Sequence, residues 1–487
     1  MVMKQIWLKP VARSHWRTCA KLAMFVLFLG SVGDVFGQET DPSADSKFWN
    51  SVYTENHVLD IQITLTADNW KAMQPSQHQR SGRGGPPGGG PPGFGPPPGG
   101  GPPSSRGGTE FTYVKAELVV DGEKYADIGL RFKGNSSYRM TANSLKRPLK
   151  IDTNKYNKGQ KLHGRDKLNL SNAVFDSAFM KEKLGYELYK SAGLATPGVG
   201  WANVTLKVGR KTTPLGIYVL IEQVDKQFLE SHFGADSKDS LLMKPEVSSW
   251  KHLGDKAEDY AGYDIKYGEK NAKLFKRFAE LLKLIEDGSK SEFEAEIGMR
   301  FDLPKLAGYL AATSLLSSLD SYVGAPHNYY LLLNQADGKL QLLPWDVNES
   351  FAAHTRGASL EQLVDWDINR PWKANRRLLE RLFETEEFPA MYRTALEKLT
   401  PEFTAEKLFP RIEEYRKAIA PHIGKYKAGP GTKGLNAGIN GDRQGINRSV
   451  DRQIPAIKPF IKLRHKSVAE QLAGKRKGKT ISSSRGR

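Results

Sequence analysis

The sequence predicts an α+β protein with two lobes, and three observations support that fold class. The stretch from Val58 to about residue 226 is dominated by short alternating runs of apolar and polar residues, which are typical of strands. From Asn271 onward the apolar residues recur at helical spacing over longer runs. Between the two halves, polar residues gather at the ends of one hairpin. A β-rich half followed by an α-rich half is the pattern of an α+β domain.

The β-rich half is expected to be an antiparallel sheet with one main helix. Its clearest unit is a hairpin in which Asp121-Gly122 joins the runs Phe111–Val120 and Lys124–Phe132. The other expected strands are Val58–Leu65, Arg147–Asp152, Lys167–Leu170, Ala202–Val208 and Gly216–Ile221, and a helix start follows the first of them at Thr66–Met73.

The main helix of this half is expected over about Ser177–Ala192. On a helical wheel Glu187 lies about 20° from the apolar residue Met180, at about 100° per residue, and Glu182 falls on the opposite side. A carboxylate on a buried face needs a partner, and Lys150 on a neighbouring strand is the candidate. The alternative, in which Glu187 only borders the apolar face and is solvated, is equally compatible with the pattern.

The α-rich half contains several runs with helical periodicity. Those predicted are Leu274–Ile285, Phe293–Met299, Leu303–Ser318, Leu360–Val364, Arg376–Phe383, Phe388–Leu399, Ala405–Ile423 and Pro455–Leu472. The helix over Ala405–Ile423 contains Pro410 and Pro421 and is expected to be broken at both. The glycine-rich stretch Gly429–Gln444 is expected to be a loop.

A hairpin in the α-rich half carries the chemically most informative residues. The strands Tyr329–Leu333 and Leu340–Leu343 flank the turn Asn334–Gly338. The open ends of a hairpin are neighbours, so Asn328, before the first strand, and Asp346, after the second, are expected to lie side by side.

Oxygen-bearing side chains held together in this way suit a hard cation, Mg²⁺ above all. Asp320, a short distance upstream, can then act as a base, and these are the parts of a phosphoryl-transfer site. Asp and Asn are also the ordinary residues of turns. From these residues alone, a purely structural role stays open.

Residues 1–37 are expected to be a secretory signal peptide. Five basic residues flank the start of the uncharged apolar run Leu22–Val32, and Val35-Phe-Gly37 supplies small residues before Gln38. The alternative is a retained membrane anchor, for which the run is short. The single cysteine, Cys19, lies in this segment, so the exported chain would have no disulfide, zinc–thiolate site or cysteine nucleophile. No later segment is long and apolar enough for a membrane helix.

The polar segment 38–57, in which Gln38–Lys47 is expected to be disordered, is expected to precede one domain over residues 58–472, with the N-lobe of that domain ending near residue 226. The Gly/Pro-rich residues 79–108 are expected to be a disordered insertion, and residues 473–487 a basic disordered tail. The formal net charge of +18 lies mostly in the leader, the insertion and the C-terminal end, so the core is near neutral. Specific nucleic-acid binding is therefore not indicated, and the tail suits contact with an anionic surface polymer.

Six stretches occur in a linked order: Arg131–Ser137, Lys146–Asp152, Phe179–Leu188, Ile221–Lys226, His327–Tyr330 and Pro344–Asn348. In this order they resemble the CotH kinase family, the spore-coat protein H type of secreted atypical protein kinase. The resemblance runs from about Val58 to Phe351, and more loosely to Leu472. It implies a divergent two-lobed protein-kinase-like fold, with ATP-dependent phosphorylation of serine in secreted or surface proteins and ATP and Mg²⁺ (or Mn²⁺) as cofactors.

The resemblance also implies roles for individual residues. Asp320 would be the catalytic aspartate, and Asn328 and Asp346 the metal ligands. The nucleotide would be held by Lys150, paired with Glu187 or, if the helical wheel is misplaced, with Glu182. Glu222 would begin the hinge that meets adenine, and the backbone of Lys133–Ser137 would cover phosphates.

Two features depart from the pattern. Eight positions separate Asp320 from Asn328, against about five in the kinase motif H-R-D-x-x-x-x-N, and Gly324–Pro326 resemble a local insertion. Relatives often have a further acidic residue near Asn348.

Two other function classes stay open: a non-catalytic envelope or surface protein that acts in assembly or adhesion, and a metal-dependent hydrolase. The sequence has no two-metal cluster of His and Asp to support the hydrolase.

Overall fold

The computed structural model describes residues 42–75 and 111–481, except residues 142, 248, 270, 325–326, 374, 427–430, 442–445 and 451. The expected leader at 1–37 and the Gly/Pro-rich insertion at 79–108 lie outside the described residues. The fold class is confirmed: a β-rich half precedes an α-rich half, with a second, smaller sheet inside the latter.

Strands of the first half close into a barrel with the order β1-β2-β3-β4-β5-β7-β6. Neighbouring strands pair antiparallel except β1 and β6, whose parallel pairing closes the barrel. The strands are β1 (Val58–Leu65), β2 (Val114–Val120), β3 (Glu123–Phe132), β4 (Leu149–Asp152), β5 (Lys167–Ser171), β6 (Val199–Val208) and β7 (Lys211–Glu222).

Alternating apolar residues fill the barrel. In β1 the side chains of Leu59, Ile61 and Ile63 are fully buried, and they belong to one cluster with residues of every other barrel strand. Burial of each such side chain contributes roughly 1.5–3 kcal/mol. The barrel is therefore a packed core, and functional side chains have to lie at its ends or outside it.

Helix α1 (Pro42–Tyr53) covers the outside of β6, where disorder was expected over Gln38–Lys47. The expectation of disorder is wrong from Pro42 onward, because two glycines of the barrel let the helix approach. A Cβ added at Gly200 would lie 2.7 Å from Cγ1 of Val52, and one at Gly198 would lie 2.4 Å from the ring of Tyr53. Two further short helices, α2 (Ala67–Met73) and α4 (Ser136–Met140), flank the barrel strands.

Helices dominate the second half, which also contains a four-stranded sheet with the order β11-β10-β8-β9. The sequence did not predict β8 (Leu241–Pro245) or β9 (Tyr263–Tyr267), whereas β10 (Tyr329–Leu333) and β11 (Leu340–Pro344) form the expected hairpin. The helices are α6 (Lys226–Phe233), α7 (Ala272–Asp287), α8 (Lys290–Arg300), α9 (Leu303–Leu316), α10 (Leu360–Val364), α11 (Arg377–Phe383), α12 (Glu387–Leu399), α13 (Ala405–Ile419), α14 (Thr432–Asn440) and α15 (Ile457–Leu472). A short two-stranded sheet, β12 (Ile446–Val450) and β13 (Arg452–Pro455), precedes α15.

Three expectations for the C-terminal part are corrected. Helix α13 continues through Pro410 and gives way only at Ala420–His422, because buried residues on both sides of Pro410, Leu408 before it and Ile412, Tyr415 and Ile419 after it, hold the helix against the core. Helix α14 occupies part of the expected glycine-rich loop. Residues 473–481 are not a disordered tail, since the backbone N–H of Lys479 donates to the Asp365 carbonyl at 2.7 Å and Arg476 pairs with the Asp365 carboxylate.

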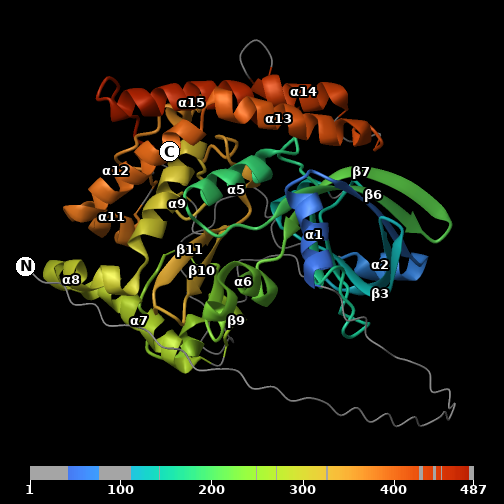
Figure 1. The fold of residues 1–487 in the computed structure, drawn as a ribbon, viewed down its shortest axis with the longest axis horizontal. Coiled ribbons are helices and arrows are strands. Elements are labelled where there is room, and N and C mark those ends of the chain that lie inside the picture. The colour runs from blue at the N-terminus through green and yellow to red at the C-terminus, as the bar shows by residue number, and fades with distance from the viewer. Residues whose placement is uncertain are drawn as a thin grey trace, which may run out of the picture. The chain divides into compact units, whose positions relative to one another are not determined.

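Helix α9 is buried from Leu306 to Leu316, as expected for a helix whose sequence is apolar on nearly every side. Helix α5 (Lys181–Ser191) packs against both α9 and β6, so it lies between the barrel and the helices of the second half (Figure 1). Among the described residues, none of the helices has the length and apolar character that a bilayer crossing requires.

Candidate active site

The open end of the β10–β11 hairpin brings two predicted metal ligands together. Tyr329 pairs with Pro344 in the antiparallel register, and the Trp345 N–H donates to the Asn328 carbonyl at 3.2 Å. Asn328 and Asp346 therefore lie next to each other at the open end of the hairpin, one before its first strand and the other after its second, as predicted. Both have left-handed backbones, with φ of 63° and 53°, a conformation that Asn and Asp tolerate better than other non-glycine residues.

Asp320 joins this pair through Asn328. Helix α9 ends at Leu316, and the loop that follows carries Asp320 to the hairpin. The Asn328 Nδ2 group donates to both the main-chain carbonyl and the Oδ2 atom of Asp320, at 2.9 Å each. The eight-residue spacing that was unusual for a kinase loop is thus closed by a side-chain hydrogen bond between its two ends.

Two lysines lie on neighbouring aromatic rings beside Asp346. Nζ of Lys133, just after β3, is 5.7 Å from the centre of the Trp345 ring, and Nζ of Lys244, on β8, is 6.0 Å from that of Tyr330. These two rings contact each other edge to face. Burial lowers the pKa of both lysines, and the Asp346 carboxylate opposes that decrease in each case.

Two carboxylates share the same surroundings. Burial raises the pKa of Asp346, with Lys133 opposing the increase and Asp320 adding to it. Glu182 on α5 is 3 % exposed, and burial raises its pKa well above the usual range, with Asp346 adding to the increase and Lys133 opposing it. Among the described residues, Oε1 of Glu182 has no hydrogen-bond partner.

Lys150 on β4 completes the set of lysines. Its Nζ donates to Oε1 of Gln223, directly after β7, at 2.7 Å. Burial, followed by the nearby positive charges of Lys133 and Arg131, lowers the pKa of Lys150 to about 7. We call Lys133, Lys150, Lys244, Glu182 and Asp346 the lysine site.

The predicted pair of Lys150 with Glu187 is not formed. Glu187 accepts a hydrogen bond from the Tyr415 hydroxyl and lies 3.7 Å from Arg411, both on α13. Glu182, the alternative, lies at the lysine site, but its electrostatic partner there is Lys133. The helical wheel was misleading because α5 is buried on almost every side, so the apolar stripe does not identify the face that meets the barrel.

Glu222, the predicted start of a hinge, directs its carboxylate away from the lysine site. It forms an ion pair with Arg165 and accepts a hydrogen bond from the Gly198 N–H at 2.8 Å. Glu222, Arg165 and Glu187 all line a cavity of about 1080 Å³ with α1 along its side, which we call the Arg165 cavity. The next residue, Gln223, is the one that meets Lys150.

Sequence reasoning missed Lys244 and Gln223 and assigned only a backbone role to Lys133. One signal was present: Lys244 is the single charged residue of an otherwise apolar strand, Leu241–Pro245. A lone lysine in such a strand needs a compensating group. Recognising it required β8 to be predicted, and β8 was not.

A cluster of possible metal ligands lies next to the site. One ligand atom from each of Asp320, Glu349 and His354 falls within 4.8 Å of the others.

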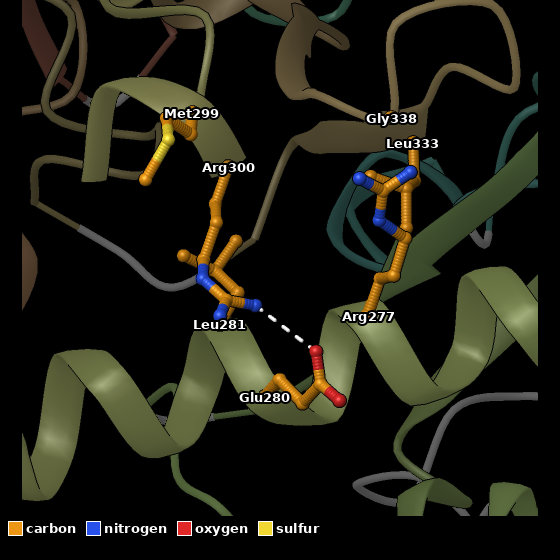
Figure 2. Close-up of a pocket in the computed structure, with 7 residues that line it drawn as sticks. All are labelled: Arg277, Glu280, Leu281, Met299, Arg300, Leu333 and Gly338. Carbon is orange, nitrogen blue, oxygen red and sulfur yellow. Dashed lines mark hydrogen bonds and ion pairs between the residues drawn. The ribbon is translucent and has the colours of Figure 1, made fainter. Parts of the chain in front are cut away.

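A separate pocket of about 270 Å³ lies away from the site, between α7, the end of α8 and the β10–β11 turn. There Arg300 pairs with Glu280, and Arg277 lies on the opposite side (Figure 2). None of the predicted site residues lines that pocket.

Fold and site together define an α+β protein in which lysines from the barrel and from the smaller sheet meet carboxylates at the open end of a hairpin. The chain belongs to the CotH kinase family: the family model for the CotH kinase protein matches residues 130–468. It is 24 % identical over 266 residues to the inner spore coat protein H of Bacillus subtilis (strain 168), covering 53 % of this chain and 69 % of that protein.

A solved structure was also matched, that of a Shewanella oneidensis MR-1 toxin–antitoxin complex of HipA, HipB and operator DNA. Identity is 11 %, the match covers 58 % of this chain and 59 % of that one, and the TM-score is 0.23. A similarity this low adds nothing to the assignment, which rests on the family match.

Proposed function

We propose that this protein is an exported kinase that transfers the terminal phosphoryl group of ATP to serine in secreted or surface proteins. Membership of the CotH kinase family supports the reaction class. The observation that carries the proposal for this chain is the lysine site: the pKa of Lys133 and of Lys244 is lowered by burial and both lysines face Asp346, while Lys150, whose pKa is also lowered, lies close to Lys133. Such crowding of cations is costly unless an anion joins them.

ATP and a divalent cation fit the residues present. Lys133, Lys150 and Lys244 would face the phosphate oxygens. Asn328 and Asp346 would supply oxygen ligands of the kind that Mg²⁺ prefers. When bound, the metal neutralises charge on the phosphates. Glu182 has an unpaired carboxylate oxygen beside Lys133, so it can hold that lysine in place.

The chain's own residues would do the remaining work by positioning. Asn328 holds Asp320 next to Asp346, and the Asp320 carboxylate can accept a hydrogen bond from a serine hydroxyl and orient its attack. Positioning and electrostatic stabilisation supply most of the catalysis in phosphoryl transfer. Export and serine as the acceptor rest on the sequence pattern and the family resemblance, and the coat-protein name of the Bacillus relative supports a surface location.

The test uses the chain without residues 1–37. Calorimetry measures Mg²⁺–ATP binding, labelled ATP measures transfer to a serine-rich acceptor, and mass spectrometry identifies the modified residue. Lys244→Met should weaken ATP binding about tenfold, or about 1.4 kcal/mol, while Lys238→Met, at an exposed position just before β8, should not. If the wild-type chain binds Mg²⁺–ATP but transfers no phosphate, the proposal fails.

A second candidate is a non-catalytic surface-assembly protein on the same fold. The printed name of the Bacillus relative, a coat protein, favours it. It predicts no binding of Mg²⁺–ATP, so the same calorimetry separates the two functions before any acceptor is known.

A further inference from the structure

The carboxylate of Asp320 has two differently held oxygens. Oδ2 accepts the hydrogen bond from Asn328 at 2.9 Å. Oδ1 is faced by Nε2 of His327, Nε2 of His354 and Nη2 of Arg356, each 3.6 Å away. Among the described residues no donor lies within hydrogen-bonding distance of Oδ1. This is therefore the oxygen left to accept a hydrogen bond from an acceptor hydroxyl.

Among the described residues, His354 is the one of these three groups that a second side chain also holds. Its Nδ1 atom lies 2.9 Å from Oε2 of Glu349, which is 6 % exposed. The His354 side chain is 23 % exposed, against 38 % for His327 and 33 % for Arg356. The ring is thus clamped between two carboxylates, with its Nε2 edge directed at Oδ1.

Glu349 ends a short helical turn, Val347–Glu349, that packs against helix α5. Lys181, the first residue of α5, is 2 % exposed, and burial lowers its pKa while the carboxylates of Asp176 and Glu349 oppose the decrease. The packing here is close, because a Cβ added at Gly185 of α5 would lie 3.1 Å from Cγ2 of Val347. Lys181 is followed directly by Glu182 of the lysine site, so the start of α5 contacts both parts of the candidate site.

We propose that His354 is a positioning residue that keeps Oδ1 of Asp320 turned toward the acceptor hydroxyl, and that Glu349 holds His354 in that orientation. The inference rests on the proposed kinase function and adds a device that couples helix α5 to the base.

The test compares His354→Phe, which keeps an aromatic ring of similar size but has no ring nitrogen, with His354→Gln, whose amide carries two N–H bonds. His354→Phe should lower kcat roughly 100-fold, with KM for ATP and the Kd of Mg²⁺–ATP unchanged. His354→Gln should recover at least about a tenth of the wild-type kcat, since one N–H can meet Glu349 and the other Asp320. His252→Phe is the control: its side chain is 22 % exposed and faces the carboxylate of Asp255.

The outcomes separate this inference from the function on which it rests. A wild-type chain that transfers no phosphate overturns both. An active wild type with an equally active His354→Phe variant overturns only the role of His354. Equal losses in the Phe and Gln variants, or weakened ATP binding together with a lower Tm, would show a merely structural role and also overturn it. If His354→Phe does not fold, Glu349→Gln decides instead. The inference then requires Glu349→Gln to have a lower kcat than His354→Gln, with the Kd of Mg²⁺–ATP unchanged in both variants.

Discussion

The lysine site and the Arg165 cavity lie against the same helix, α5, and contain the same kinds of residue, but their charges are arranged differently. In the Arg165 cavity charged groups meet partners directly: Arg165 meets Glu222, Tyr415 meets Glu187, and Nζ of Lys183 donates to two backbone carbonyls. At the lysine site, among the described residues, no ion pair within 4.0 Å joins the lysines to Glu182 or Asp346.

This difference separates structural charges from functional ones. A buried ion pair with good geometry satisfies itself and mainly contributes to stability and specificity. Buried charges that are close together but not paired shift one another's pKa, and such shifts cluster at functional sites. Substitutions in the lysine site should therefore change ligand binding and rate, whereas substitutions in the Arg165 cavity should change stability.

The largest effect is expected for Asp346→Asn. The change keeps the shape of the side chain and removes the charge that faces Lys133 and Lys244, so phosphate transfer should fall by about 10³-fold or more, or about 4 kcal/mol. Labelled ATP measures the rate, and circular dichroism checks the fold. Asp337→Asn, in the turn at the other end of the same hairpin, is the matched control and should keep the wild-type rate. A retained rate in Asp346→Asn would remove Asp346 from the site.

Glu222→Gln, in the Arg165 cavity, should lower the stability of the fold and leave ATP binding unchanged. Its side chain is 2 % exposed, and losing its charge leaves the Arg165 guanidinium without its ionic partner, so the free energy of unfolding should fall by about 3 kcal/mol. Urea denaturation measures the loss. The control Glu230→Gln breaks an exposed pair with Lys226 and should cost less than about 1 kcal/mol. If Glu222→Gln keeps its stability but weakens ATP binding, the side chain serves the nucleotide and the comparison fails.

The local parts of this structure could be predicted from the sequence. The hairpin Tyr329–Leu343 was readable because turn residues separate two apolar runs, and its geometry alone places Asn328 beside Asp346. Strand β1 was predicted with its observed ends, because its apolar residues alternate. Both predictions depend on neighbours within a few residues.

Contacts between distant segments could not be predicted in the same way. Glu182 and Glu187 are five positions apart, about 140° around a helix at 100° per residue. Only the packing of α5 between the barrel and α9 decides which of them meets Lys133. Lys244 was missed because β8 is recognisable as a strand mainly through its pairing with β10. The role of Lys150 was predicted from a resemblance, and its contact with Gln223 depends on the strand order β4-β5-β7, which places β4 and the end of β7 on the two sides of β5.

Lys150→Met and Glu187→Gln test the pairing that the sequence suggested. With Lys150 at the lysine site and Glu187 in the Arg165 cavity, Lys150→Met should weaken Mg²⁺–ATP binding about tenfold, or about 1.4 kcal/mol. Glu187→Gln should leave binding unchanged. Calorimetry gives both Kd values. Similar losses of binding in the two single variants, with no further loss in the double variant, would show that the two residues act as a pair after all.

A pH dependence of stability that belongs to Lys150 is also expected. Its pKa is lowered to about 7 in the folded chain, and a lysine in an unfolded chain titrates near 10.4. Between these values the unfolded chain binds more protons, so the contribution of Lys150 to the free energy of unfolding increases as pH rises from about 7 toward 10. Relative to Lys150→Met, the wild type should therefore gain at least about 1 kcal/mol between pH 6 and pH 9.

Urea denaturation of both chains at these two pH values measures the gain, and the difference between them cancels titrations that the two chains share. The sign of this change in stability with pH distinguishes the lysine site from the Arg165 cavity. The same comparison for Glu187→Gln should show no gain for the wild type over this range, because Glu187 is held by Tyr415 and Arg411 and is remote from the crowded lysines. A wild type that loses stability relative to Lys150→Met as pH rises would mean that Lys150 is charged and paired in the folded chain. The lysine site would then be another set of satisfied charges, like those of the Arg165 cavity.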